Sequence, residues 1–180
     1  MYIRFKLSIT ILNQEIMNIK KTLAICGYSS SGKTTLLAKV IPLLVEQGFK
    51  VATLKHTHHD VEFDISGKDS YKLRKAGSLQ TIVACDNRYA LICETPNKPA
   101  DLQTLINQFS DVDIILVEGF KDEQIPKIIC HRSSVKKPFF IDDFTLAIAS
   151  DEPLDAFLPI LDINNPLQLI EFIKSYLFNQ

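Results

Sequence analysis

Short apolar runs alternate along the chain with apolar stripes at helical spacing. Runs typical of buried strands cover residues 22–26, 49–54, 113–118, 126–131 and 144–149. After Lys33 the apolar positions follow one face of a helix that ends at Gly48, namely Leu36, Leu37, Val40, Ile41 and Leu44. Further helices are predicted over 69–76, 99–109 and 166–178. Two more strands are predicted over 79–85 and 89–94, joined by a turn at 86–88.

This alternation predicts an α/β fold. Strands that alternate with helices form a mainly parallel sheet with helices on both faces. The paired strands between 79 and 94 predict a small antiparallel element in addition. The chain after residue 16 contains no repeat, low-complexity tract or linker, so residues 17–180 are predicted to form a single domain.

The first sixteen residues differ from the rest. Ile3, Phe5, Leu7, Ile9 and Ile11 alternate with polar residues, which is the period-two pattern of a strand. Two interpretations fit residues 1–16: an extra edge strand, or an N-terminal extension created by a start assigned too early, with translation beginning at Met17. The second interpretation is favoured.

Composition limits the possible partners. The formal net charge is −1, with 46% hydrophobic and 23% charged residues, as in an ordinary soluble protein. We therefore expect no general attraction to nucleic acid. No apolar run approaches membrane-spanning length, so no membrane association is expected. The four scattered cysteines lie in or beside apolar runs and are predicted to be reduced core thiols of a cytoplasmic protein: Cys26, Cys85, Cys93 and Cys130.

Residues 27–34 match the phosphate-binding P-loop, G-x-x-x-x-G-K-T. A predicted strand precedes the loop and a predicted helix follows it, which is the context that the motif requires. The loop N–H groups and the helix N-terminus form an anion site. Lys33 is expected to reach the β- and γ-phosphates and Thr34 to bind Mg²⁺. The alternative is a glycine turn that caps an ordinary helix. The predicted nucleotide-binding residues are Gly27, Ser29, Ser30, Ser31, Gly32, Lys33, Thr34 and Thr35. The predicted fold is therefore P-loop NTPase-like.

Glu118 ends the apolar strand 113–118 and precedes Gly119. This is where P-loop proteins place a second acid that holds Mg²⁺ or orients the attacking water. With Lys33, Glu118 is a predicted catalytic residue, and with Thr34 it is a predicted metal ligand. The alternative is a solvated carboxylate at a strand end.

The segment 55–60 places three histidines directly after a strand. Three interpretations remain open: a transition-metal site with Asp60 and Asp64, a binding site for an anionic ligand, or a polar loop whose histidines bond locally. The candidate residues for such an anionic ligand are His56, His58, His59, Lys68 and Arg74, with Lys55 as a further cation.

Asp151 follows the strand 144–149 at the same predicted edge of the sheet. A carboxylate there can accept hydrogen bonds from guanine N1 and N2 and favour GTP over ATP. Alternatively, Asp151 caps a turn before Pro153.

Several of these stretches together resemble the molybdopterin-guanine dinucleotide biosynthesis protein B family. The matching stretches are 27–37, 55–60, 67–71, 74–77, 115–121, 147–151 and 161–164. The P-loop is shared by many families, whereas the histidine stretch combined with Gly67-Lys68-Asp69-Ser70-Tyr71 is more specific. The resemblance covers residues 20–178 and leaves 1–16 outside.

The resemblance implies a GTP-binding adapter of molybdenum cofactor biosynthesis. Implied with it are Mg²⁺, weak GTP hydrolysis, a homodimer, and partnership with the guanylyltransferase that makes molybdopterin guanine dinucleotide. It also implies molybdopterin as a second ligand near the histidine and basic loop, or a dimer contact there. Two other function classes remain open: a P-loop small-molecule kinase or ligase, and a metal-delivery GTPase that uses His56, His58 and His59.

Overall fold

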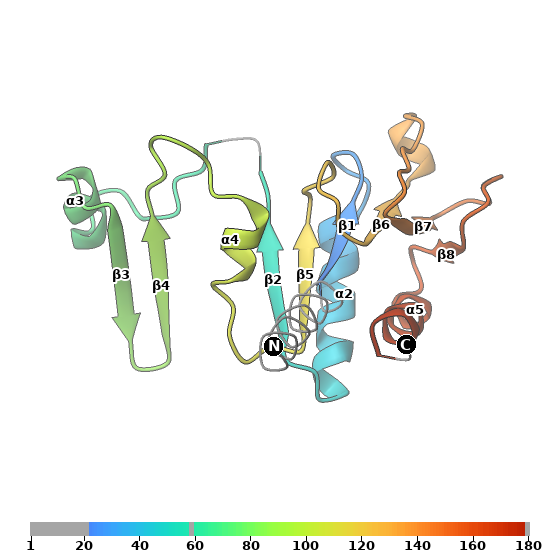
Figure 1. The fold of residues 1–180 in the computed structure, drawn as a ribbon, viewed down its shortest axis with the longest axis horizontal. Coiled ribbons are helices and arrows are strands. Elements are labelled where there is room, and N and C mark those ends of the chain that lie inside the picture. The colour runs from blue at the N-terminus through green and yellow to red at the C-terminus, as the bar shows by residue number, and fades with distance from the viewer. Residues whose placement is uncertain (1–21, 58–59, 179–180) are drawn as a thin grey trace, which may run out of the picture. The chain divides into compact units, whose positions relative to one another are not determined.

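The structure, a computed structural model, describes residues 22–57 and 60–178. The chain packs as two compact units. The larger unit contains the described chain up to His56 and again from Leu105, and the smaller unit is the segment Thr57–Thr104. Figure 1 labels the elements of both. The predicted strand or extension at 1–16 lies outside the described residues, and the single domain over 17–180 stays a prediction.

A six-stranded sheet forms the larger unit, in the order β2-β5-β1-β6-β7-β8. All neighbouring strands are parallel, so the six carboxyl ends lie along one edge, where such sheets bind ligands. In chain order the strands are β1 (Thr22–Cys26), β2 (Val51–Lys55), β5 (Ile114–Glu118), β6 (Lys127–Cys130), β7 (Thr145–Ser150) and β8 (Ile160–Asp162).

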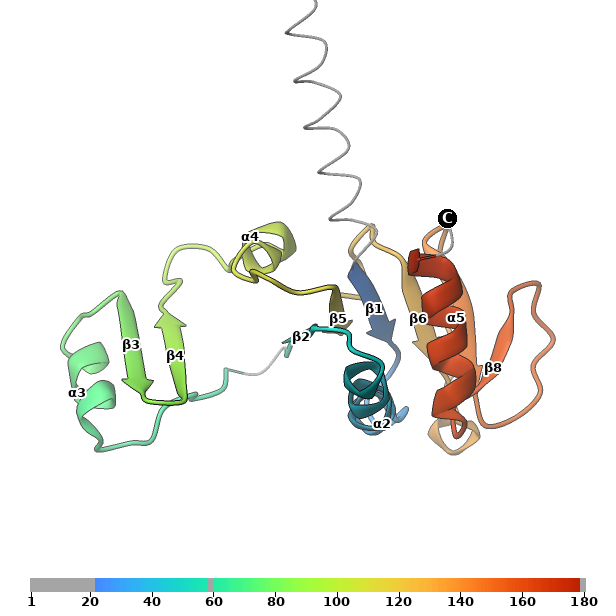
Figure 2. The same cartoon turned by 90° about the horizontal axis from the view of Figure 1, so that it is seen from below.

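Helices α2 (Lys33–Glu46) and α5 (Pro166–Phe178) contact each other on one side of this sheet (Figure 2). Their apolar faces pack on alternate strand residues, because successive side chains of a strand point to opposite faces. Each buried Leu or Ile there stabilises the fold by about 1.5–3 kcal/mol. The central members are Leu23, Ile25, Leu36, Val40, Leu44, Ile114, Leu116, Leu169, Ile170 and Ile173. Helix α4 (Leu102–Ile106) begins in the smaller unit and ends in the larger one. The predicted α/β fold, a mainly parallel sheet with helices, is confirmed.

A connection without a helix, residues 119–126, joins β5 to β6 across β1. Because parallel crossovers are right-handed, it lies on the face opposite α2. The fully buried Lys127 holds it in place: Nζ donates to the carbonyls of Lys121 and Glu123 at 2.8 Å each, and to Asp142 Oδ2 at 2.6 Å. Beneath the connection, Cys26 Sγ donates to Gly119 O at 3.1 Å, and burial raises the pKa of Cys26 to about 11.

The smaller unit contains α3 (Asp69–Lys75) and an antiparallel pair, β3 (Gln80–Cys85) and β4 (Arg88–Cys93). This is the predicted antiparallel element, and its turn is at Asp86-Asn87. Of the residues in α3, β3 and β4, only Thr81 is buried. Cys85 and Cys93 are exposed, so the prediction that all four cysteines lie in the core is wrong for these two. The cause is that a lone two-stranded sheet has no interior to bury them.

The predicted elements otherwise match, with two differences. The helix expected over 99–109 is shorter, because Asp101 caps it through a 2.7 Å hydrogen bond from Thr104 N and the segment before Leu102 is not helical. Strand β8 was not predicted, since three residues are too few for a periodic signal. Within the described ranges, no helix is long and apolar enough to cross a membrane.

The Lys127–Asp142 contact generates a stability prediction. Partial burial alone raises the pKa of Asp142, but hydrogen bonds from Lys127 and Thr145 more than offset it and hold that pKa below its ordinary value of 3.8. The contact therefore stabilises the fold above that pH, and its contribution is lost as acid protonates Asp142. We expect Asp142→Asn to cost about 1–2 kcal/mol of unfolding free energy at pH 7, with Asp143→Asn near neutral. Urea unfolding at pH 7 and below pH 4 checks this, and an unchanged gap between wild type and variant at both pH values would contradict it.

Candidate functional site

The glycine loop lies between the carboxyl end of β1 and the first residue of α2, as the motif predicts. Gly27 has φ +143° and Gly32 has φ +90°, conformations that side chains disfavour. Gly27 is also tightly surrounded: a Cβ there would lie 2.5 Å from the carbonyl oxygen of Cys130 and 2.6 Å from Ser31 Oγ. The loop thus packs its first glycine against β6, which leaves no room for any other residue type.

Lys33 and Ser31 point their polar groups inside this loop. Lys33 Nζ donates to the carbonyl oxygens of Gly27 and Tyr28 at 3.0 and 2.7 Å, so its ammonium lies over the loop. Ser31 is 1% exposed, and its hydroxyl has no hydrogen-bond partner among the described residues. The neighbouring Ser29 and Ser30, and Thr34 and Thr35 on the first turn of α2, are exposed. The structure therefore brings the predicted phosphate-binding residues together at the start of α2.

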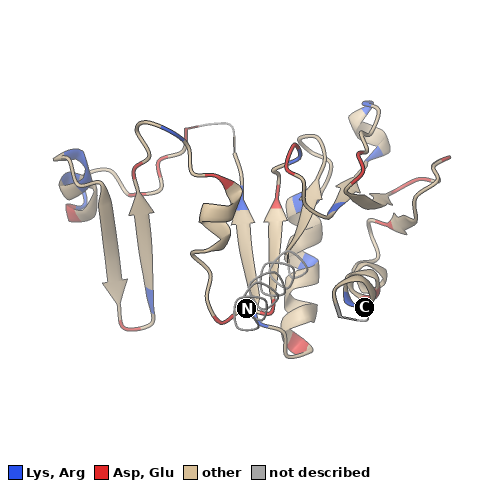
Figure 3. Cartoon of the chain, viewed as in Figure 1, with Lys and Arg blue, Asp and Glu red and all other residues tan. Residues whose placement is uncertain are grey.

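The carboxylate of Glu118 lies beside the hydroxyl of Thr34, at the edge of the sheet where the carboxyl ends of the strands lie. The Thr34 hydroxyl oxygen lies 2.9 and 2.8 Å from the two carboxylate oxygens of Glu118. Lys55 completes the cluster, with Nζ 3.0 Å from Glu118 Oε1 and 3.4 Å from Thr34 Oγ1. Sheet register explains the contact, because Lys55 on β2 is the direct partner of Glu118 on β5 (Figure 3). Lys55 was a candidate cation for an anionic ligand. In the structure it forms an ion pair with Glu118, the predicted metal-binding acid.

The rest of the histidine segment divides between the two units. His56 belongs to the larger unit. Its backbone N–H donates to the Glu118 carbonyl oxygen at 2.9 Å, and the centroid of its ring lies 4.5 Å from that of the Phe120 ring. His58 and His59 lie outside the described residues. No group of three or more His, Cys, Asp or Glu side chains placed to hold a metal occurs in the part of the chain that is described.

Lys68 and Arg74 belong to the smaller unit. Lys68 is exposed and immediately precedes α3. The side chain of Arg74 is 8% exposed, although the residue as a whole is half-buried, and it forms ion pairs with Glu62 and, at 2.6 Å, with Glu94. A hydrogen bond to Glu94 raises the pKa of Arg74 further. Arg74 thus links α3 to the residue that follows β4, which accounts for the side chain within its own unit. Its role toward a second ligand stays a prediction.

Asp151 is occupied by neighbouring residues of the larger unit. Its Oδ1 accepts the Ser133 N–H at 2.8 Å, its Oδ2 accepts the Ser133 hydroxyl at 3.3 Å, and Arg132 lies 3.6 Å away. The backbone hydrogen bond from Ser133 lowers the pKa of Asp151. The carboxylate therefore fixes the turn after β6, including the short 3₁₀ helix Ser133–Val135, and holds Arg132 beside Gly32. Its proposed contact with guanine remains a prediction.

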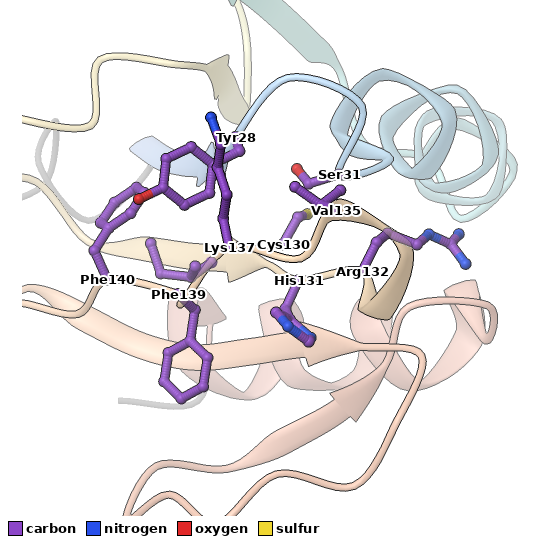
Figure 4. A pocket seen from close by; sticks show the side chains of 11 residues that line it. Tyr28, Ser31, Cys130, His131, Arg132, Val135, Lys137, Phe139 and Phe140 are labelled. Atoms are coloured by element: carbon purple, nitrogen blue, oxygen red, sulfur yellow. The ribbon is translucent and has the colours of Figure 1, made fainter.

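A pocket opens beside the loop at the end of β6 (Figure 4). Its residues come from the loop itself, from the end of β6, and from the segment before β7. Sequence reasoning missed this pocket, because the segment 135–140 follows no helix or strand period. Only the fold brings it to the loop. The lining side chains include Tyr28, Ser31, His131, Arg132, Lys137, Phe139 and Phe140.

Sheet order, glycine loop and first helix together define a protein with a P-loop NTPase-like fold. The chain belongs to the family described as molybdopterin guanine dinucleotide synthesis protein B, which matches residues 22–151. The resemblance seen in the sequence is thereby confirmed.

Individual relatives agree with this assignment. The chain is 48% identical over 158 residues to a molybdopterin-guanine dinucleotide biosynthesis adapter protein of Haemophilus influenzae, covering 86% of this chain and 88% of that one. It is 46% identical over 164 residues to the adapter protein of Escherichia coli, covering 88% and 94%. The crystal structure of Bacillus subtilis MobB has a TM-score of 0.72 at 27% identity, covering 89% of this chain and 99% of that one.

The packing at Gly27 generates a prediction. Gly27→Ala introduces both a disfavoured φ and a backbone clash, and we expect it to cost at least about 3 kcal/mol of unfolding free energy. Gly48→Ala is the matched control, since Gly48 has φ +89° but nothing within 4 Å of its added Cβ. It should cost about 1 kcal/mol. Chemical denaturation of both variants measures the difference, and equal losses would show that the close approach to β6 is unimportant.

Proposed function

We propose that this protein is a GTP-binding adapter with a role in molybdopterin guanine dinucleotide biosynthesis. The observation that carries the proposal is the meeting of the P-loop with Glu118 through Thr34. The relatives named as adapter proteins of that biosynthesis, at 48% and 46% identity, support the pathway.

The residues present fit GTP with Mg²⁺. The loop provides backbone N–H groups at a helix N-terminus, and Lys33 adds an ammonium within the same loop. Thr34 and Glu118 place a hydroxyl and a carboxylate side by side, and oxygen ligands of this kind suit Mg²⁺. Bound Mg²⁺ supplies charge neutralisation between phosphate oxygens. Asp151 remains the candidate for contact with the guanine base.

Slow hydrolysis fits the state of Glu118. Both of its oxygens accept from Thr34, and one is also paired with Lys55. Both carboxylate oxygens are thus engaged by the side chains that surround the start of α2. We therefore assign Glu118 to Mg²⁺ rather than to proton abstraction. This favours a protein that holds GTP for a partner over one that turns it over rapidly.

The partner proposed is the guanylyltransferase that joins GMP to molybdopterin, with molybdopterin as the second ligand. Family membership favours this adapter over a small-molecule kinase or ligase and over a metal-delivery GTPase. His56, His58, His59 and Lys68 stay candidates for the second ligand or for a dimer contact.

A homodimer formed through the smaller unit is part of the proposal. A two-stranded sheet is marginal in water by itself. Large apolar side chains on β3 and β4 are nevertheless exposed, including Ile82 at 63%, Val83 at 45% and Leu91 at 42%. Ile82 and Leu91 are cross-strand partners, so they form one patch. Contiguous apolar surface of this kind marks an interface, and a second copy of the same unit offers a matching one.

The nucleotide assignment predicts the behaviour of Lys33→Ala. We expect it to remove measurable GTP binding in a calorimetric titration, because the loop loses its only side-chain cation. Lys39 is an exposed lysine on the same helix, and Lys39→Ala should bind GTP normally.

Glu118→Gln should still bind GTP, but GTP binding by this variant should no longer depend on Mg²⁺. In a reconstituted assay with the guanylyltransferase, wild type should stimulate dinucleotide formation and Lys33→Ala should not. Unchanged GTP affinity in Lys33→Ala, or no stimulation by wild type, would overturn the proposal.

The dimer proposal predicts that Ile82→Lys is monomeric where wild type is dimeric. Each lost Ile burial weakens association by roughly 1.5–3 kcal/mol, or about tenfold or more in dissociation constant. Gln80→Lys adds the same charge two residues away on the same strand face, where wild type already has an exposed polar residue. Sedimentation velocity across a concentration series separates the cases. Equal sedimentation of the two variants would place the interface elsewhere.

A further inference from the structure

Lys55 places its ammonium against the two side chains that are proposed to hold Mg²⁺. Its Nζ lies 3.0 Å from Glu118 Oε1 and 3.4 Å from Thr34 Oγ1. The Thr34 hydroxyl oxygen lies 2.9 and 2.8 Å from the two carboxylate oxygens of Glu118, so the three polar groups form one cluster. The proposed function assigns no role to this lysine. Because the ammonium and a Mg²⁺ ion use the same two oxygen-bearing side chains, the two cations compete for them.

The backbone on either side of this contact is fixed. Lys55 and Glu118 are direct partners in the parallel ladder of β2 and β5. Immediately beyond them, the backbone N–H of His56 donates to the Glu118 carbonyl oxygen at 2.9 Å. Gly119, with φ +97°, packs so closely against His56 that an added Cβ would lie 3.2 Å from the His56 Cβ. An exchange of cations at Glu118 therefore moves the Lys55 side chain and leaves the strands in place.

The two partners of the ion pair differ in their exposure to solvent. The Glu118 side chain is 11% exposed, whereas that of Lys55 is 59% exposed. A largely exposed lysine leaves an ion pair at small cost, because water solvates the released ammonium. A mostly buried carboxylate is not solvated in the same way and requires a cation beside it. Glu118 thus has a counter-ion within the chain that can leave when a divalent cation takes its place.

The charges at this edge indicate when that exchange occurs. Lys55 already balances the single negative charge of Glu118, and its ammonium repels a free divalent ion. Bound phosphates reverse this balance, because they bring negative charge and further oxygen ligands to the start of α2. Proteins typically bind Mg²⁺ through one or two carboxylates together with phosphates of a ligand. Exchange of Lys55 for Mg²⁺ is therefore favoured once a nucleotide is bound.

We propose that Lys55 is a positioning residue that makes metal binding at Glu118 depend on the nucleotide. Its ammonium neutralises the carboxylate and holds it beside Thr34, which disfavours the capture of free metal ions. When a nucleotide delivers Mg²⁺, the lysine side chain yields its place to the ion. The inference rests on the proposed function for the identity of the metal site, and it adds a residue that decides when the metal binds there.

The test uses the full chain and Mn²⁺, which prefers oxygen ligands as Mg²⁺ does and is counted by electron paramagnetic resonance. Mn²⁺ is titrated into nucleotide-free protein and into protein saturated with a non-hydrolysable GTP analogue. Lys55→Met removes the charge but keeps an unbranched side chain, and Lys55→Arg keeps the charge. Lys50→Met is the matched control, since Lys50 precedes the other end of β2, is 57% exposed and pairs with Asp111 at 2.6 Å.

Nucleotide-free Lys55→Met should bind Mn²⁺ about fivefold more tightly than wild type. This is the upper end of the range for an exposed ion pair, because the carboxylate partner is mostly buried. Lys55→Arg and Lys50→Met should bind Mn²⁺ as wild type does. With the analogue bound, the difference between Lys55→Met and wild type should shrink, because the phosphates offer the displaced ammonium a new partner. Glu118→Gln combined with Lys55→Met should abolish the gain, since the effect passes through this carboxylate.

Three results overturn the inference. The first is a Mn²⁺ affinity of nucleotide-free Lys55→Met that is equal to or weaker than that of wild type. The second is an equal gain in Lys50→Met, which would reveal a general effect of net charge. The third is a gain that persists in the Glu118→Gln background, which would place the competition at another acid. Failure of the proposed function has a different signature: Mg²⁺ would not strengthen GTP binding by wild type, which calorimetry shows without any change at Lys55.

Discussion

The position of β5 between β1 and β2 is the constraint on which the candidate site depends. In the register β2-β5-β1, Glu118 is paired with Ile25 on one side and Lys55 on the other. β5 therefore ends at Glu118, level with the residue two positions before the glycine loop and directly beside Lys55. No flexible segment is needed to bring the acid, the hydroxyl and the ammonium together. The ladder hydrogen bonds of the neighbouring strands β2, β5 and β1 set the spacing of these residues, which is the rigid support that a phosphate and metal site requires.

The sequence predicts the parts of this arrangement that obey local rules. A glycine loop between a strand and a helix, and an acid at the end of an apolar strand, are both local patterns, and the structure confirms their placement. The amino-acid sequence does not predict the partners of Glu118 and Asp151, because Lys55 and Ser133 reach these acids only through sheet order and register. Lys127 is a similar case: a lysine at the start of an apolar strand gives no sign that it is fully buried. The pocket beside the glycine loop depends on segments more than a hundred residues apart in the chain.

The two units differ in how they use apolar residues. The larger one buries its Leu, Ile and Val side chains between the sheet and helices α2 and α5. The smaller one has no core of comparable kind, and its two cysteines and the large apolar side chains of its hairpin are exposed. Hydrogen bonds and the Arg74 ion pairs define its backbone, but little apolar burial supports it. The stability of the smaller unit is therefore expected to depend on what covers it, whereas the larger unit has a buried apolar core of its own.

The order of the strands also governs how the chain reaches this structure. β1 lies between β5 and β6, and the contact between Cys26 and Gly119 spans 93 residues. The smaller unit is inserted in that interval. During synthesis, β1, α2 and β2 emerge long before the strand that must separate β1 from β2. Their apolar faces stay uncovered until Glu118 has left the ribosome, because non-local pairing must close this long loop first. Such a nascent chain exposes the apolar surface that chaperones bind, even though the folded larger unit is well packed.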